Sequence, residues 1–267
     1  MYAYAQTNIQ LFNQLQEAGY EHDDLACVRD AYALAMRLFT GCFRQSGKAF
    51  LSHLVGTASI LVESRASSTT VAAGLLHSAY SHGEFGTGRR GISDAKRKQL
   101  RLVLGSTVEQ IVADYTSVLW TEQTISALHD SLPPAGSVAR EVLLIRLANE
   151  LEDHLDGAAL YSGAAQYRRD IIKAYLFQCV DIAEKLGFCD LALALSRAFE
   201  ETLSLELPLA LQGENINLTH KKAVHLIAWK SSFLFPPATH GLRLKVRVSR
   251  ILPRRLLARV ARFALPL

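Results

Sequence analysis

The chain has 267 residues, of which 49% are hydrophobic and 20% charged, enough for one large domain with a sizeable core. It has no apolar run of about 18 residues, which argues against a membrane-spanning helix, and its first residues lack a signal-peptide pattern. The four cysteines form no Cys-x-x-Cys pair, so we predict buried free thiols and a cytoplasmic location.

The formal net charge of +4 is unevenly distributed along the chain. Residues 241–267 contain eight basic side chains and no acidic one, whereas the rest of the chain has 21 basic and 25 acidic side chains. We therefore expect a mildly acidic globular domain over residues 1–208, a connector over residues 209–240 and a basic tail over residues 241–267.

Helical periodicity extends over most of the expected domain. Apolar residues recur at three- and four-residue steps over 9–15 and 25–39, and further helices are expected over residues 50–64, 68–80, 95–104, 107–118, 137–155, 164–186 and 192–205. The segment 81–94 contains four glycines and is predicted to be a loop. Because residues 242–248 are the one run with alternating apolar positions, the predicted fold class is all-α, a helical bundle.

Two histidines on adjoining predicted helices are the main candidate functional residues. His53 ends the segment 43–53 and His77 ends the segment 70–77. Together with residues 104–112 and 143–151, these segments resemble, in the same order, the motifs of the HD-domain superfamily, in particular the hydrolase domain of guanosine tetraphosphate enzymes. The resemblance implies an HD-like bundle in which His53 and His77 hold a divalent metal. It also implies that Arg44 packs on the purine of a nucleotide-like substrate.

The chain departs from this pattern at the metal ligands. Ser78 stands where the family has the aspartate of its His-Asp pair, and Asn149 stands where it has the distal aspartate. Two imidazoles, a hydroxyl and an amide supply no negative charge for Mn²⁺ or Mg²⁺. The sequence from His77 to Tyr80 also resembles a divergent bacterial branch with His-Ser-x-Tyr in place of His-Asp.

Four interpretations of the site remain open. The first is ordinary HD metallohydrolysis. The second is a rearranged Zn²⁺, Fe²⁺ or Mn²⁺ site with His53, His77 and His82 as ligands, to which Glu84, Asp153 and His154 could add.

The third interpretation is a metal-free acid–base site, and the fourth is a noncatalytic module for ligand binding or partner interaction. In the third, loop 81–94 closes over a small phosphorylated or nucleotide-like metabolite. The candidate catalytic residues are His53, His77, Tyr80, His82 and Glu84. The candidate substrate-binding residues are Arg44, Ser78, Arg89, Arg90 and Asn149.

The charged residues of the segment 137–155 receive a structural interpretation. Most of them, including Glu152 and Asp153, are predicted to be solvated or paired along the helix, as Arg146 and Glu150 would be at a spacing of four. Arg168 is predicted to lie on the surface.

The basic tail predicts an amphipathic helix over residues 253–265. Pro253 can begin it, with Leu256, Val260 and Phe263 on one face and four arginines on the other. It could dock on its own domain, on a second subunit of a homo-oligomer, on another protein or on an anionic membrane surface. Nucleic acid is not the expected partner, because Phe263 is the lone aromatic residue there.

Overall fold

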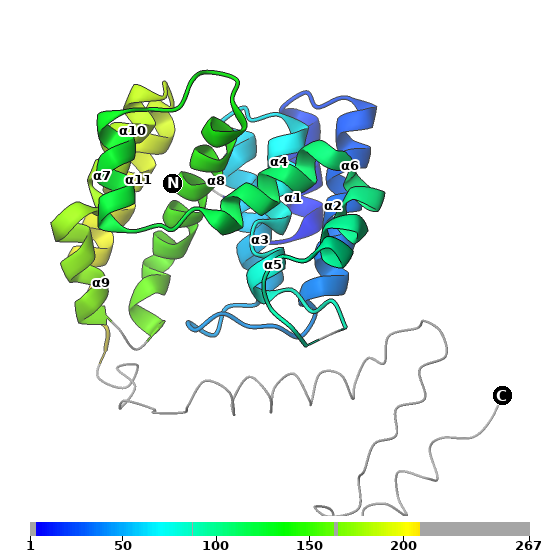
Figure 1. The fold of residues 1–267 in the computed structure, drawn as a ribbon. Helices are drawn as coiled ribbons and strands as arrows, with labels where there is room; N and C mark the ends of the chain where they lie inside the picture. Colours follow the sequence, from blue (N-terminus) through cyan, green and yellow to red (C-terminus); the bar gives the residue numbers. More distant parts are fainter. Residues whose placement is uncertain (1–3, 87, 163–164, 209–267) are drawn as a thin grey trace, which may run out of the picture. The chain divides into compact units, whose positions relative to one another are not determined.

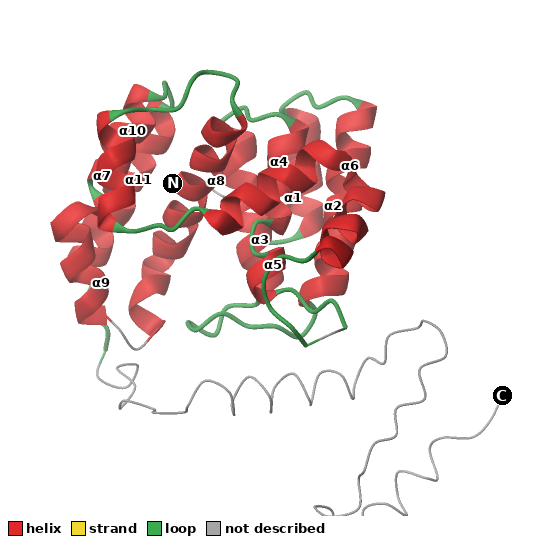
Figure 2. Cartoon of the chain, viewed as in Figure 1, coloured by secondary structure: helices red, strands yellow, loops and turns green. Residues whose placement is uncertain are grey.

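The computed structural model describes residues 4–86, 88–162 and 165–208. Over these residues the fold is all-α, as predicted, with helices joined by loops and no strand (Figures 1 and 2). No helix in the described part is long and apolar enough to cross a membrane. The predicted connector 209–240 and tail 241–267, with its helix 253–265, lie outside the described residues.

The helices follow one another with short connections. They are α1 (Asn8–Glu17), α2 (His22–Phe39), α3 (Phe50–Glu63), α4 (Ser68–Leu76), α5 (Ala79–His82), α6 (Asp94–Ser117), α7 (Glu122–Asp130), α8 (Val138–His154), the 3₁₀-helix η1 (Leu155–Ser162), α9 (Ala165–Ile171), the π-helix η2 (Ile172–Leu176), α10 (Gln178–Lys185) and α11 (Cys189–Ser204).

Helix α3 lies at the centre of the core. Eleven of its 14 residues are buried, which agrees with its almost continuous apolar sequence. It packs against α1, α4 and α8, while α4 packs against α2 and α6 (Figure 1). Polar side chains on the inner faces of α3, α4 and α8 therefore lie beside the hydrophobic core.

The predicted helix 68–80 is interrupted at the candidate site residue His77. Helix α4 ends at Leu76, and α5 begins at Ala79. The His77 ring nitrogen Nδ1 lies 2.7 Å from the Gly74 carbonyl, which would accept the next backbone N–H of a continuing helix. Such a side-chain hydrogen bond competes with the helical ladder, so the histidine itself helps to end the helix.

Other predictions differ in detail. The segment 164–186 is divided into α9, η2 and α10, and α7 has no counterpart among the predicted helices. Gly105, with φ of +81°, separates two halves of α6, as predicted between residues 104 and 107. All four cysteines are free, as predicted, but Cys179 alone is buried, and Cys189 is exposed.

Candidate functional site

His53 and His77 meet in the core where α3, α4 and α8 pack together. Their Nε2 atoms are 3.4 Å apart, and the ring centroids are 5.3 Å apart at an interplanar angle of 76°. Their exposed fractions are 0% and 1%. The structure thus brings together the two histidines that the sequence singles out.

The outer nitrogen of each ring has a defined partner. His53 Nδ1 bonds the Glu152 carboxylate, and His77 Nδ1 bonds the Gly74 carbonyl. Since both partners accept hydrogen bonds, each neutral ring carries its proton on Nδ1. The two Nε2 lone pairs then face the same point. Burial, and next the repulsion that a second positive charge would meet from a protonated His53, hold the pKa of His77 well below its usual value.

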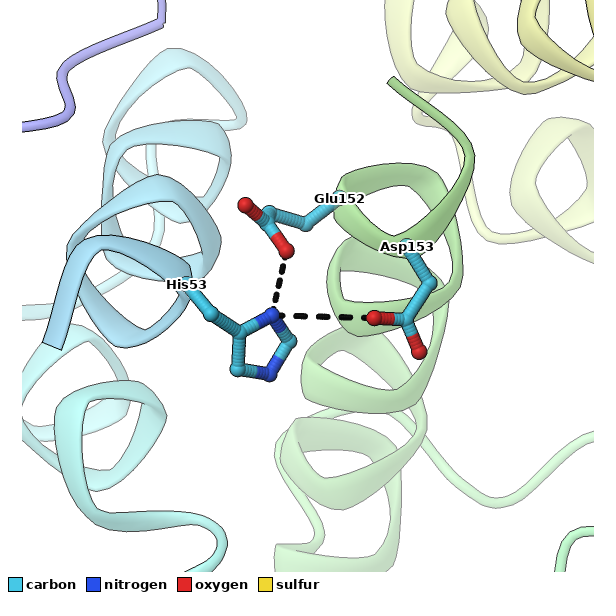
Figure 3. Close-up of side chains that lie close together, drawn as sticks. All are labelled: His53, Glu152 and Asp153. Carbon is cyan, nitrogen blue, oxygen red and sulfur yellow. Dashed lines mark hydrogen bonds and ion pairs between the residues drawn. The ribbon is translucent and has the colours of Figure 1, made fainter. Parts of the chain in front are cut away.

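Helix α8 supplies two carboxylates to this cluster (Figure 3). Glu152 is almost fully buried, and Asp153 Oδ1 lies 3.7 Å from His53 Nδ1. The prediction that Glu152 is solvated or paired along its helix is wrong, because it is buried and its partners come from outside α8. Helical spacing could have placed Glu152 in the site. Glu152 and Asp153 are three and four residues after Asn149, so they share its face of the helix.

Gly56 on α3 makes room for the buried carboxylate. A Cβ atom at this position would lie 2.8 Å from both Cγ and Oε1 of Glu152. Real Cβ atoms do not approach other atoms so closely, so the absence of a side chain at Gly56 allows Glu152 to reach His53.

The loop between α2 and α3 brings two cations to the carboxylates. Arg44 Nη2 bonds Asp153, Arg44 Nη1 lies 2.8 Å from His53 Nε2, and Lys48 Nζ bonds Glu152. A turn closes this loop, with Arg44 N–H donating to Lys48 O at 2.8 Å and Gly47 at a φ of +86°. Burial alone would raise the pKa of Asp153, but the charge and hydrogen bond of Arg44, together with the nearby His53 ring, lower it below its usual value.

A small polar cavity adjoins this cluster. Its volume is about 60 Å³, and Arg44, Lys48 and Arg168 line it together with Glu152 and Asp153. Arg168, which was predicted to be an ordinary surface residue, has no ion pair within the described residues. Three cations against two carboxylates leave the cavity with an excess of positive charge, which suits an anionic group.

The metal implied by the family resemblance does not fit these residues. Ser78 and Asn149 supply no charge, and Asn149 Nδ2 lies 3.5 Å from Asp153 Oδ2. His53, Glu152 and Asp153 have the spacing of metal ligands. However, Arg44 and Lys48 already satisfy both carboxylates, so a divalent ion would meet two cations at its own ligands.

Tyr80 belongs to a different cluster. Its hydroxyl donates to buried Glu109 at 2.7 Å, and Glu109 also accepts from Arg97 and Arg101. Burial, and next the hydrogen bond and charge of Glu109, raise the pKa of Tyr80. The Tyr80 hydroxyl thus bonds Glu109 and neither histidine, and its catalytic role stays a prediction.

His82 and Ser78 lie at the margin of the site. Exposed His82 places its ring 5.3 Å from that of Phe50, and its Nδ1 lies 3.0 Å from Ser81 Oγ. The packing around its ring, followed by the charges of Arg90 and Arg44, lowers the pKa of His82 to about 4. Ser78 is buried, and its carbonyl accepts from the His82 N–H at 2.9 Å.

Glu84, Arg89 and Arg90 are exposed on the loop between α5 and α6. Arg90 Nη1 donates to the Ser81 carbonyl at 3.0 Å. Buried Lys96 holds the same loop, because its Nζ donates to the carbonyls of Arg89 and Gly91 at 2.6 and 2.9 Å. The candidate lid is therefore fastened to α6 in this structure.

The prediction that Arg146 pairs with Glu150 along the helix is wrong. Its guanidinium lies 3.7 Å from the Tyr115 ring centroid and donates to the carbonyls of Tyr115 and Val118. Glu150 instead accepts from Trp120 Nε1 at 3.0 Å. This region contributes to packing around His77, whose ring centroid is 4.9 Å from that of Tyr115.

Comparison with known protein families finds a similarity in the first half of the chain. A family model described as a domain of unknown function, DUF6817, matches residues 36–119. This part includes both histidines, Arg44 and Lys48, and it ends before α8 and its carboxylates. No curated protein matches the chain. The chain is thus similar, over less than half of its length, to a domain whose function is itself unassigned.

Proposed function

We propose that this protein is a divergent HD-like enzyme that acts on a small phosphorylated or nucleotide-like metabolite by acid–base chemistry at His53. No divalent metal takes part in the proposed reaction. The observation that carries the proposal is the row of Glu152, His53 and His77 beside a cavity with excess positive charge. The HD-like assignment is supported by the convergence of the two histidines from α3 and the end of α4.

His53 is the proposed general base. The Glu152 carboxylate fixes the proton of His53 on Nδ1, which leaves the Nε2 lone pair available. After proton transfer, the negative charge of Glu152 stabilises the imidazolium. The Nε2 atom of His77, 3.4 Å away, can then accept a hydrogen bond from the new proton.

Arg44 connects substrate binding to this base. In the structure its guanidinium lies against His53 Nε2 and pairs with Asp153. A substrate phosphate in the cavity would attract Arg44, Lys48 and Arg168. When the guanidinium turns toward the phosphate, His53 Nε2 becomes accessible to a substrate hydroxyl or a water molecule, and the buried surroundings strengthen the electrostatic contacts.

An activity screen tests this proposal. The full chain is incubated with phosphorylated sugars, nucleotides and their diphosphates in the presence of EDTA, with product analysis by mass spectrometry. We expect a turnover that falls by about 10²-fold or more in His53→Ala and Glu152→Gln, whereas the exposed control Glu200→Gln retains it. Turnover that requires an added metal, or that survives both substitutions, would contradict the proposal.

A noncatalytic anion-binding module is the second candidate. It is favoured by the complete burial of His53 and by the partners of both its ring nitrogens. In this case Arg168→Ala weakens binding of a phosphorylated ligand, measured by calorimetry, and the wild-type protein returns every bound ligand unchanged. Detection of a product that His53→Ala cannot form would exclude this candidate.

A further inference from the structure

We propose that Arg44 and Lys48 together supply the positive charge that a divalent cation would otherwise bring to His53, Glu152 and Asp153. Both side chains come from the short loop between α2 and α3, and each binds one of the two α8 carboxylates. The inference concerns the charge balance of the cluster, so it holds whether or not the site is catalytic.

The ligand atoms of the cluster are already engaged by protein groups. His53 Nδ1 bonds Glu152, and His53 Nε2 faces Arg44 Nη1 at 2.8 Å. The same guanidinium reaches Asp153 through Nη2, so Arg44 spans a nitrogen ligand and an oxygen ligand as a bound metal ion would. Lys48 completes the set by bonding the second oxygen of Glu152.

Among the paired side chains the charges balance without an ion, and Arg168 adds the excess charge of the adjoining cavity. Two carboxylates, one fully buried and one largely buried, are matched by two cationic side chains. A divalent ion among the same ligands would add two positive charges beside Arg44 and Lys48 at ion-pair distance, where the effective dielectric constant is low. Ion and side chains therefore exclude one another.

The proposal predicts that a variant without both cations binds a metal ion. Removal of both cations would leave one imidazole and two carboxylates, whose ligand atoms lie within 4.8 Å of one another. A nitrogen and two carboxylate oxygens suit Zn²⁺ or Co²⁺. The variant Arg44→Ala/Lys48→Ala should thus gain a metal site that the natural chain lacks, and the negative charge left in the core should favour a bound cation.

Cobalt titration of the full chain tests the inference. We expect wild-type protein to show no saturable Co²⁺ absorption or calorimetric binding up to 1 mM, on the order of the weakest metal sites in proteins. The double variant should bind one Co²⁺ at least about 100-fold more tightly, and the added change His53→Gln should abolish this binding.

The matched control is the charge-conserving double variant Arg44→Lys/Lys48→Arg, which should bind no better than wild type. If the double alanine variant does not fold without metal, Co²⁺ binding by the wild-type protein still tests the inference. Stoichiometric Co²⁺ binding by wild type that is lost in His53→Gln would overturn the inference, as would a folded double variant that binds no Co²⁺. Neither outcome depends on turnover, so failure of this inference is distinguishable from failure of the proposed enzyme activity.

Discussion

The Nε2 atoms of His53 and His77 lie 3.4 Å apart, while the Nδ1 atom of each ring bonds an acceptor on its own side. Two rings that carry their proton on Nδ1 alone direct two Nε2 lone pairs at one point. The arrangement is stable only when a donor or a cation interacts with at least one of them. Arg44 Nη1, 2.8 Å from His53 Nε2, provides this interaction.

The depressed pKa of His77 predicts a pH dependence of stability. Below the ordinary value of 6.5, the unfolded chain gains a proton at His77 that the folded chain does not bind. The free energy of unfolding therefore decreases as the pH falls below 6.5, by up to about 1.4 kcal/mol per pH unit, until folded His77 itself titrates.

Urea unfolding between pH 8 and pH 5 measures this effect. His77→Gln should flatten the pH profile, whereas the exposed control His22→Gln should leave the wild-type slope unchanged. Equal slopes in wild type and His77→Gln would show that His77 is protonated in the folded chain.

Gly56→Ala should disrupt the contact between Glu152 and His53. The new methyl group would lie 2.8 Å from Glu152 Cγ, so overpacking should lower the free energy of unfolding by about 1–3 kcal/mol. Gly74→Ala is a matched control, because its methyl group would meet Leu61 instead. NMR of the ring nitrogens should show a changed His53 Nδ1 signal in Gly56→Ala and an unchanged one in the control.

The cluster around Glu109 should contribute to the stability of the fold but not to anion binding or turnover. Tyr80→Phe removes one hydrogen bond to Glu109 and should cost about 1 kcal/mol, and Glu109→Gln, which leaves two arginines without their carboxylate, about 1–3 kcal/mol. Neither should change anion binding at the Arg168 cavity. A stable Tyr80→Phe protein that has lost turnover would instead restore the catalytic role that the sequence suggested.

Lys96 should control access to the loop between α5 and α6. Lys96→Met removes two hydrogen bonds from Lys96 Nζ to the loop carbonyls of Arg89 and Gly91. Limited trypsin digestion after Arg89 and Arg90 should become roughly tenfold faster, because cleavage follows local opening. The exposed control Lys98→Met should be cleaved at the wild-type rate, and equal rates for both variants would contradict the anchoring role.

The fold class and most helix positions could be predicted because they depend on local patterns. The nearly continuous apolar run of α3 identifies a buried helix, and the predicted range 50–64 agrees with Phe50–Glu63. The break after Leu76 depends instead on a side-chain bond from His77 to the Gly74 carbonyl, which helical periodicity does not reveal. Helix propensity favours one continuous helix over residues 68–80, and the bond between His77 and Gly74 divides it.

The two histidines of the candidate site could be predicted from the sequence, but the buried ion pairs beside them could not. His53 and His77 stand in recognisable segments, whereas Glu152 resembles an ordinary solvated residue of an amphipathic helix. Its burial depends on the missing side chain of Gly56 and on Lys48, which are 96 and 104 positions away in the chain. Such compensation between distant charges follows from tertiary packing, so single-sequence patterns do not contain it.

The protonation states of the two rings test the account most directly. Side-chain ¹H–¹⁵N correlation spectra of full-length protein prepared without chelator, recorded at pH 8 and assigned with His53→Gln and His77→Gln, report which nitrogen carries each proton. The account predicts Nδ1–H tautomers for both rings, with two unprotonated Nε2 atoms and no metal-shifted signal. A proton or a bound metal on Nε2 of either ring would contradict it.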